Sequence, residues 1–197
     1  MLRDEDLVRL EAVWRAQGAP IADSLAPGLS GDDLAELEAE HGLVVPAELR
    51  LWWGWHDGVV GGGRRGGSLS AIGAGPWHFL SLGEALDVRR FHIALDPSPF
   101  PESVDDWNGE WASWWLPVFK AGSACCFADL STATDSGVSI HLWAQQPDDP
   151  FTPMFASFGE MVEASADGIE RGYFTWRRDL REWEISDALS ADAMRLL

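Results

Sequence analysis

Hydrophobic side chains recur at helical spacing in the first part of the chain. Between residues 4 and 17 the apolar positions lie three or four residues apart, and a Gly-Ala-Pro sequence follows at Gly18. This spacing predicts an amphipathic helix that ends at the glycine. The inward-facing positions of this helix are Leu7, Leu10 and Trp14.

Two further helices are predicted between residues 30 and 58. Ser30, with Asp33 three residues later, is typical of a helix N-cap, and Gly42 suits the position that follows a helix end. Pro46 is expected in the first turn of the next helix, because that turn needs no backbone N–H from it. This third helix carries Leu49, Trp52 and Trp53 on one side and is expected to end near residues 56–58.

The pattern changes to strand after residue 114. Apolar runs at residues 115–119, 125–130 and 138–143 are separated by short segments rich in Gly, Ser, Thr and Asp. Three successive strands with short connections predict an antiparallel meander. Residues 77–80 predict an earlier strand. Residues 151–156 predict a fourth strand of the meander, which Pro153 would confine to an edge or a bulge.

Two more helix starts follow from capping boxes. Ser81 with Glu84 predicts a short helix through Arg90, and Ser157 with Glu160 predicts a helix that ends near residue 172. The apolar residues of segment 173–185 show neither helical nor strand periodicity, and residues 186–197 predict a last helix. Helices first, then a meander, then a closing helix indicate an α+β fold, with helices packed against a mainly antiparallel sheet. We expect one domain over residues 1–197, with a helical N-terminal extension and a short C-terminal helix.

The composition supports a single well-packed core. The chain has 197 residues, of which 46% are hydrophobic, including 12 Trp and 9 Phe. No apolar run approaches the length of a membrane-spanning helix, and the first residues are charged, so a cytoplasmic location is expected. Cys125 and Cys126 are adjacent, which is a poor geometry for a disulfide bond between them. Both are therefore expected to be reduced strand residues on opposite faces of the sheet.

The net charge of −18 argues against general nucleic-acid binding and against anionic membrane surfaces, because both are polyanions. Two interpretations of the acidity stay open. One is simple solubility, and the other is a protein partner with a basic surface. Lys120 is the single lysine of the chain.

The candidates for catalytic chemistry are weak. His56 and Asp57 are adjacent and would not face each other on a helix, and the other histidines lack metal-ligand spacing. The glycine-rich segment 61–67 has no Gly-Lys-Ser/Thr ending for phosphate, and Ser68 and Ser70 lack a nucleophile elbow. Acidic doublets at residues 32–33, 105–106 and 148–149 are typical of solvated loops. We therefore expect no catalytic residue, no metal and no cofactor.

A tryptophan-rich acidic segment is the best candidate for partner binding. Trp107, Trp111 and Trp114 would share one face if the segment were helical, and core packing is one explanation. The other is a protein interface, because exposed aromatic side chains amid charge favour interfaces. The candidate partner-binding residues are Asp105, Asp106, Trp107, Glu110 and Trp111.

Three segments together resemble the SMI1/KNR4, or SUKH, family. Residues 37–50 read LEAEHGLVVPAELR and are followed by Asp57-Gly58, which is similar to the family's Glu, Gly, Leu-Pro and helix ending in Asn/Asp-Gly. Trp115-Leu116-Pro117-Val118, with Asp129 closing the next strand, is similar to the family's Trp-aliphatic-Pro strand and the strand after it. Ser157-Phe158 is similar to the opening of its last helix.

The resemblance implies an α+β fold and a protein-binding role. Many bacterial members of the family resemble immunity proteins encoded beside polymorphic or contact-dependent toxins, and fungal members are cell-wall and signalling regulators. No catalytic residue set is associated with the family. The leading hypothesis is a non-enzymatic immunity protein whose partner is a cognate toxin with a basic surface. A regulatory adaptor with an endogenous partner is the alternative, and an unrecognised hydrolase ranks third.

Overall fold

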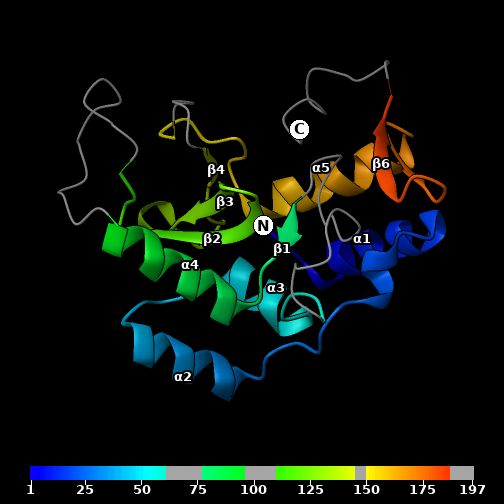
Figure 1. The fold of residues 1–197 in the computed structure, drawn as a ribbon. Coiled ribbons are helices and arrows are strands. Elements are labelled where there is room, and N and C mark those ends of the chain that lie inside the picture. The colour runs from blue at the N-terminus through cyan, green and yellow to red at the C-terminus, as the bar shows by residue number, and fades with distance from the viewer. Residues whose placement is uncertain (61–76, 96–109, 145–149, 187–197) are drawn as a thin grey trace.

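The computed structural model describes residues 1–60, 77–95, 110–144 and 150–186. The helices are α1 (Asp4–Gln17), α2 (Gly31–His41), α3 (Ala47–Trp55), α4 (Leu82–Leu95) and α5 (Phe158–Glu170). The strands are β1 (His78–Phe79), β2 (Trp115–Ala121), β3 (Ala124–Asp129), β4 (Ile140–Trp143), β5 (Phe174–Arg177) and β6 (Glu182–Ile185) (Figure 1).

The predicted helices are confirmed, and their ends follow the capping residues. The Ser30 hydroxyl accepts a hydrogen bond from the Asp33 N–H at 3.1 Å, and Gly18 and Gly42 end α1 and α2 in the left-handed conformation. Helix α4 is longer than expected, because it continues past Arg90 to Leu95. The expected glycine-rich loop at 61–67 and the helix after residue 186 lie outside the described residues.

The sheet confirms the α+β fold and the antiparallel meander. Strands β2, β3 and β4 are consecutive antiparallel neighbours, and β1 pairs with β2 to give the order β1-β2-β3-β4. The strand expected at 151–156 does not form: only Phe155 makes an isolated bridge, to Ile140. Pro153 has no N–H to donate to a ladder there. The unassigned segment 173–185 forms the hairpin β5-β6.

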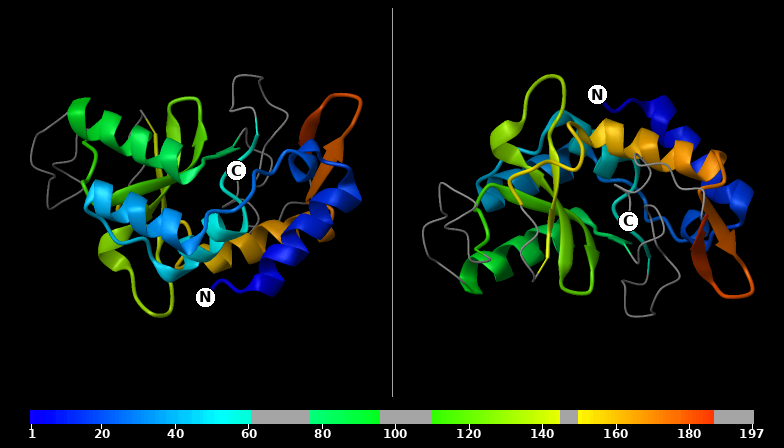
Figure 2. Two further views of the ribbon diagram at one scale, coloured as in Figure 1. Left: turned by 90° about the horizontal axis from the view of Figure 1, so that it is seen from below. Right: turned by 90° about the horizontal axis from the view of Figure 1, so that it is seen from above.

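The two faces of the sheet pack into different hydrophobic clusters. The larger cluster contains the inward side chains of α1, α3 and α5, together with alternate sheet residues such as Leu116, Cys126 and Ile140. Helices α1 and α5 lie side by side, and α4 runs along the opposite side of the molecule (Figure 2). The opposite face of the sheet forms the aromatic cluster, whose buried members are Trp111, Ala112, Trp115, Cys125, Phe127 and Trp143.

A β-bulge in β2 changes which face its last residues occupy. The register to β3 shifts between Pro117 and Phe119, so that Val118 is an extra residue. Val118 and Phe119 consequently both belong to the larger cluster. Lys120 then pairs with Cys125, a member of the aromatic cluster, and so lies on the aromatic face of the sheet.

The carboxylate of Glu48 is buried at the centre of the fold. Its side chain lies in α3 and is 2% exposed. It accepts backbone hydrogen bonds from Leu2 (2.6 Å), Val138 (3.2 Å), Phe158 (3.1 Å) and Gly159 (3.3 Å). Four N–H donors satisfy the buried charge, which would otherwise be strongly unfavourable.

We expect Glu48→Gln to lower the free energy of unfolding by about 2–4 kcal/mol, because an amide group replaces an acceptor oxygen and faces backbone donors. Urea denaturation at neutral pH measures this. Glu36→Gln is the matched control, since Glu36 is exposed on α2 and should change stability by less than about 0.5 kcal/mol. Equal stabilities of the two variants would contradict this account of Glu48.

Both cysteines should be unreactive in the folded protein. Cys125 and Cys126 are buried on opposite faces of β3, as predicted. Burial raises the pKa of the Cys125 thiol to about 11 and raises that of Cys126 further, so little reactive thiolate exists near pH 8. Titration with a thiol reagent should detect both thiols only after urea is added. Rapid modification of either thiol in the native protein would contradict the placement of β3.

Candidate functional site

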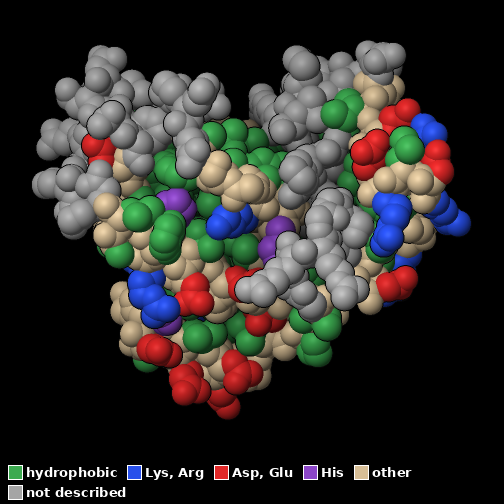
Figure 3. Space-filling model, viewed as in Figure 1, with side chains coloured by type: hydrophobic (Ala, Val, Ile, Leu, Met, Phe, Trp, Pro, Cys, Tyr) green, Lys and Arg blue, Asp and Glu red, His purple; other side chains and the backbone are tan. Residues whose placement is uncertain are grey.

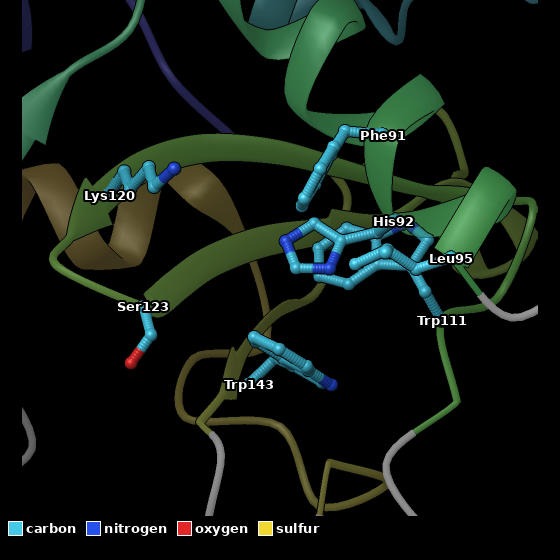
Figure 4. A pocket seen from close by; sticks show the side chains of 7 residues that line it. All are labelled: Phe91, His92, Leu95, Trp111, Lys120, Ser123 and Trp143. Atoms are coloured by element: carbon cyan, nitrogen blue, oxygen red, sulfur yellow. The ribbon is translucent and has the colours of Figure 1, made fainter.

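A cavity of about 370 Å³ opens on the aromatic face of the sheet, between the strands and the end of α4. This size is within the usual range for small-ligand and side-chain pockets. Its walls come from α4, the segment before β2, the β2-β3 turn and two strands (Figure 4). The lining residues are Phe91, His92, Leu95, Trp111, Lys120, Ser123 and Trp143.

The pairing of the strands determines which side chains form the polar and aromatic sides of the pocket. Lys120 in β2 and Trp143 in β4 both pair with Cys125 of β3, so the three residues form one row across the aromatic face. Lys120 reaches this row because of the bulge at Val118. Ser123 follows Gly122 in the tight β2-β3 turn, where a positive φ of 59° favours glycine.

Aromatic rings make up most of the pocket wall. The His92 ring stacks on Trp111 with centroids 4.6 Å apart and meets the Trp143 ring edge-on at 4.6 Å. Behind them Trp115 stacks on Phe127 at 4.1 Å. Such contacts fix the rings in place, because each is held by at least one neighbour. The wall is therefore a preformed surface.

The mouth of the pocket is apolar and exposed. Phe91 is 59% exposed and Leu95 is 64% exposed, both on the last turns of α4. Hydrophobic side chains gather over this end of α4 and the neighbouring strands on the face shown in Figure 3. Exposed apolar side chains grouped at the mouth of a pocket are typical of binding surfaces.

One fixed positive charge lines the pocket. The described residues form no ion pair with Lys120. Burial, and to a smaller extent the charge of Lys120, lowers the pKa of His92, so its imidazole is neutral near pH 7. The pocket thus combines neutral aromatic walls with a single ammonium group.

The predicted partner-binding segment is only partly described. Asp105, Asp106 and Trp107 lie outside the described residues. Glu110 is half-buried, and Trp111 is 5% exposed within the aromatic cluster, where its edge lines the pocket. Residues 110–114 are not helical, so Trp111 shares no helical face with Trp114. The role of the segment in partner binding stays a prediction.

The His56-Asp57 pair is structural. The His56 Nδ1 atom lies 2.6 Å from the carbonyl oxygen of Ala26. The Asp57 carboxylate accepts a 2.7 Å hydrogen bond from the N–H of Leu82 at the start of α4. The two side chains are thus held by different segments.

The described residues contain neither a metal-ligand cluster nor a membrane-spanning helix. They contain no group of three or more His, Cys, Asp or Glu side chains arranged to hold a metal ion. None of their helices has both the length and the apolar composition needed to cross a membrane.

Sequence reasoning did not single out most of the pocket. Phe91, His92, Leu95, Ser123 and Trp143 had no motif around them. Two features of the sequence could have indicated the pocket. Pro117 lies inside a predicted strand and so favours a bulge, and the single lysine of the chain follows three residues later.

Comparison with protein families gives one result. A family described as "SMI1 / KNR4 family (SUKH-1)" matches residues 28–164, which is more than half of the chain. The matched span contains the whole four-stranded sheet and every residue that lines the pocket, whereas α1 precedes it and the β5-β6 hairpin follows it. No curated protein matches the chain.

Trp111 and Trp114 are a matched pair for testing which tryptophans are core. Trp111→Ala should lower the free energy of unfolding by about 3–5 kcal/mol, because it removes a ring packed against Trp115, Phe127 and Trp143. Trp114→Ala should cost less than about 1 kcal/mol, because Trp114 is 39% exposed. Urea denaturation of both variants measures this. A smaller loss for Trp111→Ala than for Trp114→Ala would refute the assignment.

Proposed function

Because this chain belongs to the SMI1/KNR4 family (SUKH-1), we propose that it is a non-enzymatic, protein-binding immunity protein that neutralises a bacterial toxin of the polymorphic or contact-dependent kind. The family match over the sheet and the pocket is the observation that carries this proposal. The protein would act by covering the active or substrate-binding surface of the toxin.

The charge distribution supports a partner with a basic surface. Asp32, Glu36 and Glu40 are exposed on α2 at intervals of four residues, so the three carboxylates share one side of the helix. Acidic side chains gather over α2 along the lower edge of Figure 3. Like charges at this spacing slightly destabilise the free helix, and a basic partner would relieve the repulsion.

The acidic and aromatic surfaces would serve different steps of binding. Carboxylates on α2, together with the predicted Asp105, Asp106 and Glu110, would speed association with a cationic toxin. Apolar side chains at the pocket would slow dissociation, because they leave water only in the final complex.

Family membership is equally compatible with a regulatory adaptor that binds an endogenous protein, so the test must separate the two. A candidate toxic domain, if one is encoded beside this gene, is expressed in bacteria with and without this protein. An immunity protein should restore growth and form a complex with the toxin that survives gel filtration. No rescue, together with a stable complex with an endogenous protein, would favour the adaptor and overturn the proposal.

Association kinetics with the same toxin test the acidic surface. The triple variant Asp32→Asn/Glu36→Gln/Glu40→Gln should associate with the toxin several-fold more slowly at low salt, and the difference should shrink as the Debye length falls to about 8 Å. The control variant Asp4→Asn/Glu163→Gln/Glu182→Gln removes the same number of exposed charges elsewhere. Equal association rates for the two variants would exclude a local role for α2.

A further inference from the structure

The pocket differs from the rest of the protein surface in its charge. The chain carries a net charge of −18, and Lys120 is its one lysine. Several arginines are already paired: Arg9 with Asp167 and Glu170, Arg15 with Glu11, and Arg50 with Glu38. Lys120 has no such partner among the described residues, so its ammonium group is available to an external anion.

The surroundings of Lys120 favour an anion attached to an aromatic group. Its neighbours in the pocket are the rings of Phe91, His92 and Trp143, with Leu95 at the mouth. The neutral His92 ring adds no second charge. An aromatic side chain placed among these rings would bury apolar area on both sides and make edge or stacking contacts.

The chain itself covers most of the β4 edge beside the pocket. The N–H and C=O of Ile140 point away from β3, because both form hydrogen bonds with Phe155. Leu142 lies two residues further along β4 and has the same orientation. Met154 also donates its N–H to the Ile140 carbonyl, and the carbonyl oxygen of Pro150 lies 2.8 Å from the Nδ1 atom of His141. Within the described residues of this edge, Leu142 alone keeps an outward N–H and C=O without a partner. The pocket, and not the strand edge, is therefore the surface open to a partner.

We propose that a segment of the partner protein places an aromatic side chain in the pocket between Phe91 and Trp143 and pairs a neighbouring carboxylate with Lys120. This inference rests on the proposed protein-binding function and names the chemistry that the site recognises. The acidic surface attracts a basic partner, and the pocket then selects one acidic-aromatic segment of it.

Lysine-selective labelling makes the test specific, because Lys120 is the only lysine. Protein grown with [13C,15N]-lysine should give one side-chain methylene signal next to the ammonium group. The probe is the capped dipeptide acetyl-Trp-Asp-amide, with acetyl-Trp-Asn-amide and acetyl-Ala-Asp-amide as matched controls. A ligand of this size should bind with a Kd on the order of 1 mM.

We expect saturable shifts of the Lys120 signal with acetyl-Trp-Asp-amide. The Asn peptide should bind about 5–10-fold more weakly, since it lacks the charge, and the Ala peptide should show no saturation. Backbone amide spectra of Lys120→Met should show that the two Trp peptides now bind equally. Arg90→Gln removes a charge on α4 outside the pocket and should keep the preference for Asp.

Two results would overturn the inference. One is no saturable shift at about 20 mM peptide, and the other is equal affinity for the Asp and Asn peptides in the unmodified protein. These assays need no toxin, so failure of growth rescue with intact peptide binding would remove the immunity role alone.

The link between the pocket and the partner is tested in the complex. Phe91 is exposed, so Phe91→Ala should leave folding unchanged and raise the dissociation rate of the partner complex at least fivefold. Val8→Ala on α1, another exposed apolar position, is the control. Equal dissociation rates for the two variants would show that the partner does not anchor in this pocket.

Discussion

The buried carboxylate of Glu48 connects segments that are far apart in the sequence. It receives hydrogen bonds from Leu2, two residues before α1, from Val138, two residues before β4, and from the first turn of α5. The positive end of the α5 dipole adds to this stabilisation. Two glycines leave room for the carboxylate, because a Cβ at Gly137 would lie 2.8 Å from its Oε2 atom and a Cβ at Gly159 would lie 3.0 Å from its Oε1 atom. One charged group thus fixes the helices against the sheet.

The pocket depends on this arrangement through α3 and α4. Glu48 fixes the start of α3, and Asp57 just beyond the end of α3 accepts the N–H of Leu82. Gly58 permits close contact there, since a Cβ would lie 2.6 Å from the Ser81 nitrogen. Burial raises the pKa of Asp57, and the nearby charge of Glu84 raises it further. The hydrogen bond from Leu82 therefore offsets part of the cost of burying the Asp57 carboxylate. The direction of α4, and with it the position of Phe91 and Leu95, follows from this junction.

The aromatic face of the sheet is only partly closed by the rest of the protein. Its aromatic cluster is buried at Trp115 and Phe127 but opens at the end of α4, where large apolar side chains are exposed. The exposed carboxylates of α2 give a second, electrostatic feature outside the pocket. A family member that binds a basic protein would use both, one for the rate of encounter and the other for the lifetime of the complex.

The local sequence determined where most helices and strands begin and end, because capping residues, turns and apolar periods act over only a few residues. Ser30, Gly18 and Gly42 marked helix ends, the apolar runs marked β2 to β4, and their short connections required an antiparallel meander. The alternation of Cys125 and Cys126 followed from the period of a strand. Family motifs in the sequence also indicated the α+β fold, which the family match supports.

Tertiary structure decided everything that depends on contacts between distant residues. The pairing of β1 with β2 spans about forty residues of sequence, and no local pattern encodes it. The exposed Glu36 and the buried Glu48 are both helical glutamates, and only the donors from other segments distinguish them. Trp111 could be core or interface until the positions of Trp115, Phe127 and Trp143 were known. Lys120 faces the pocket only because the extra residue Val118 moves the side chains after it to the opposite face of the sheet. The strand propensity of the sequence is the same with or without this shift, so it could not predict the position of Lys120.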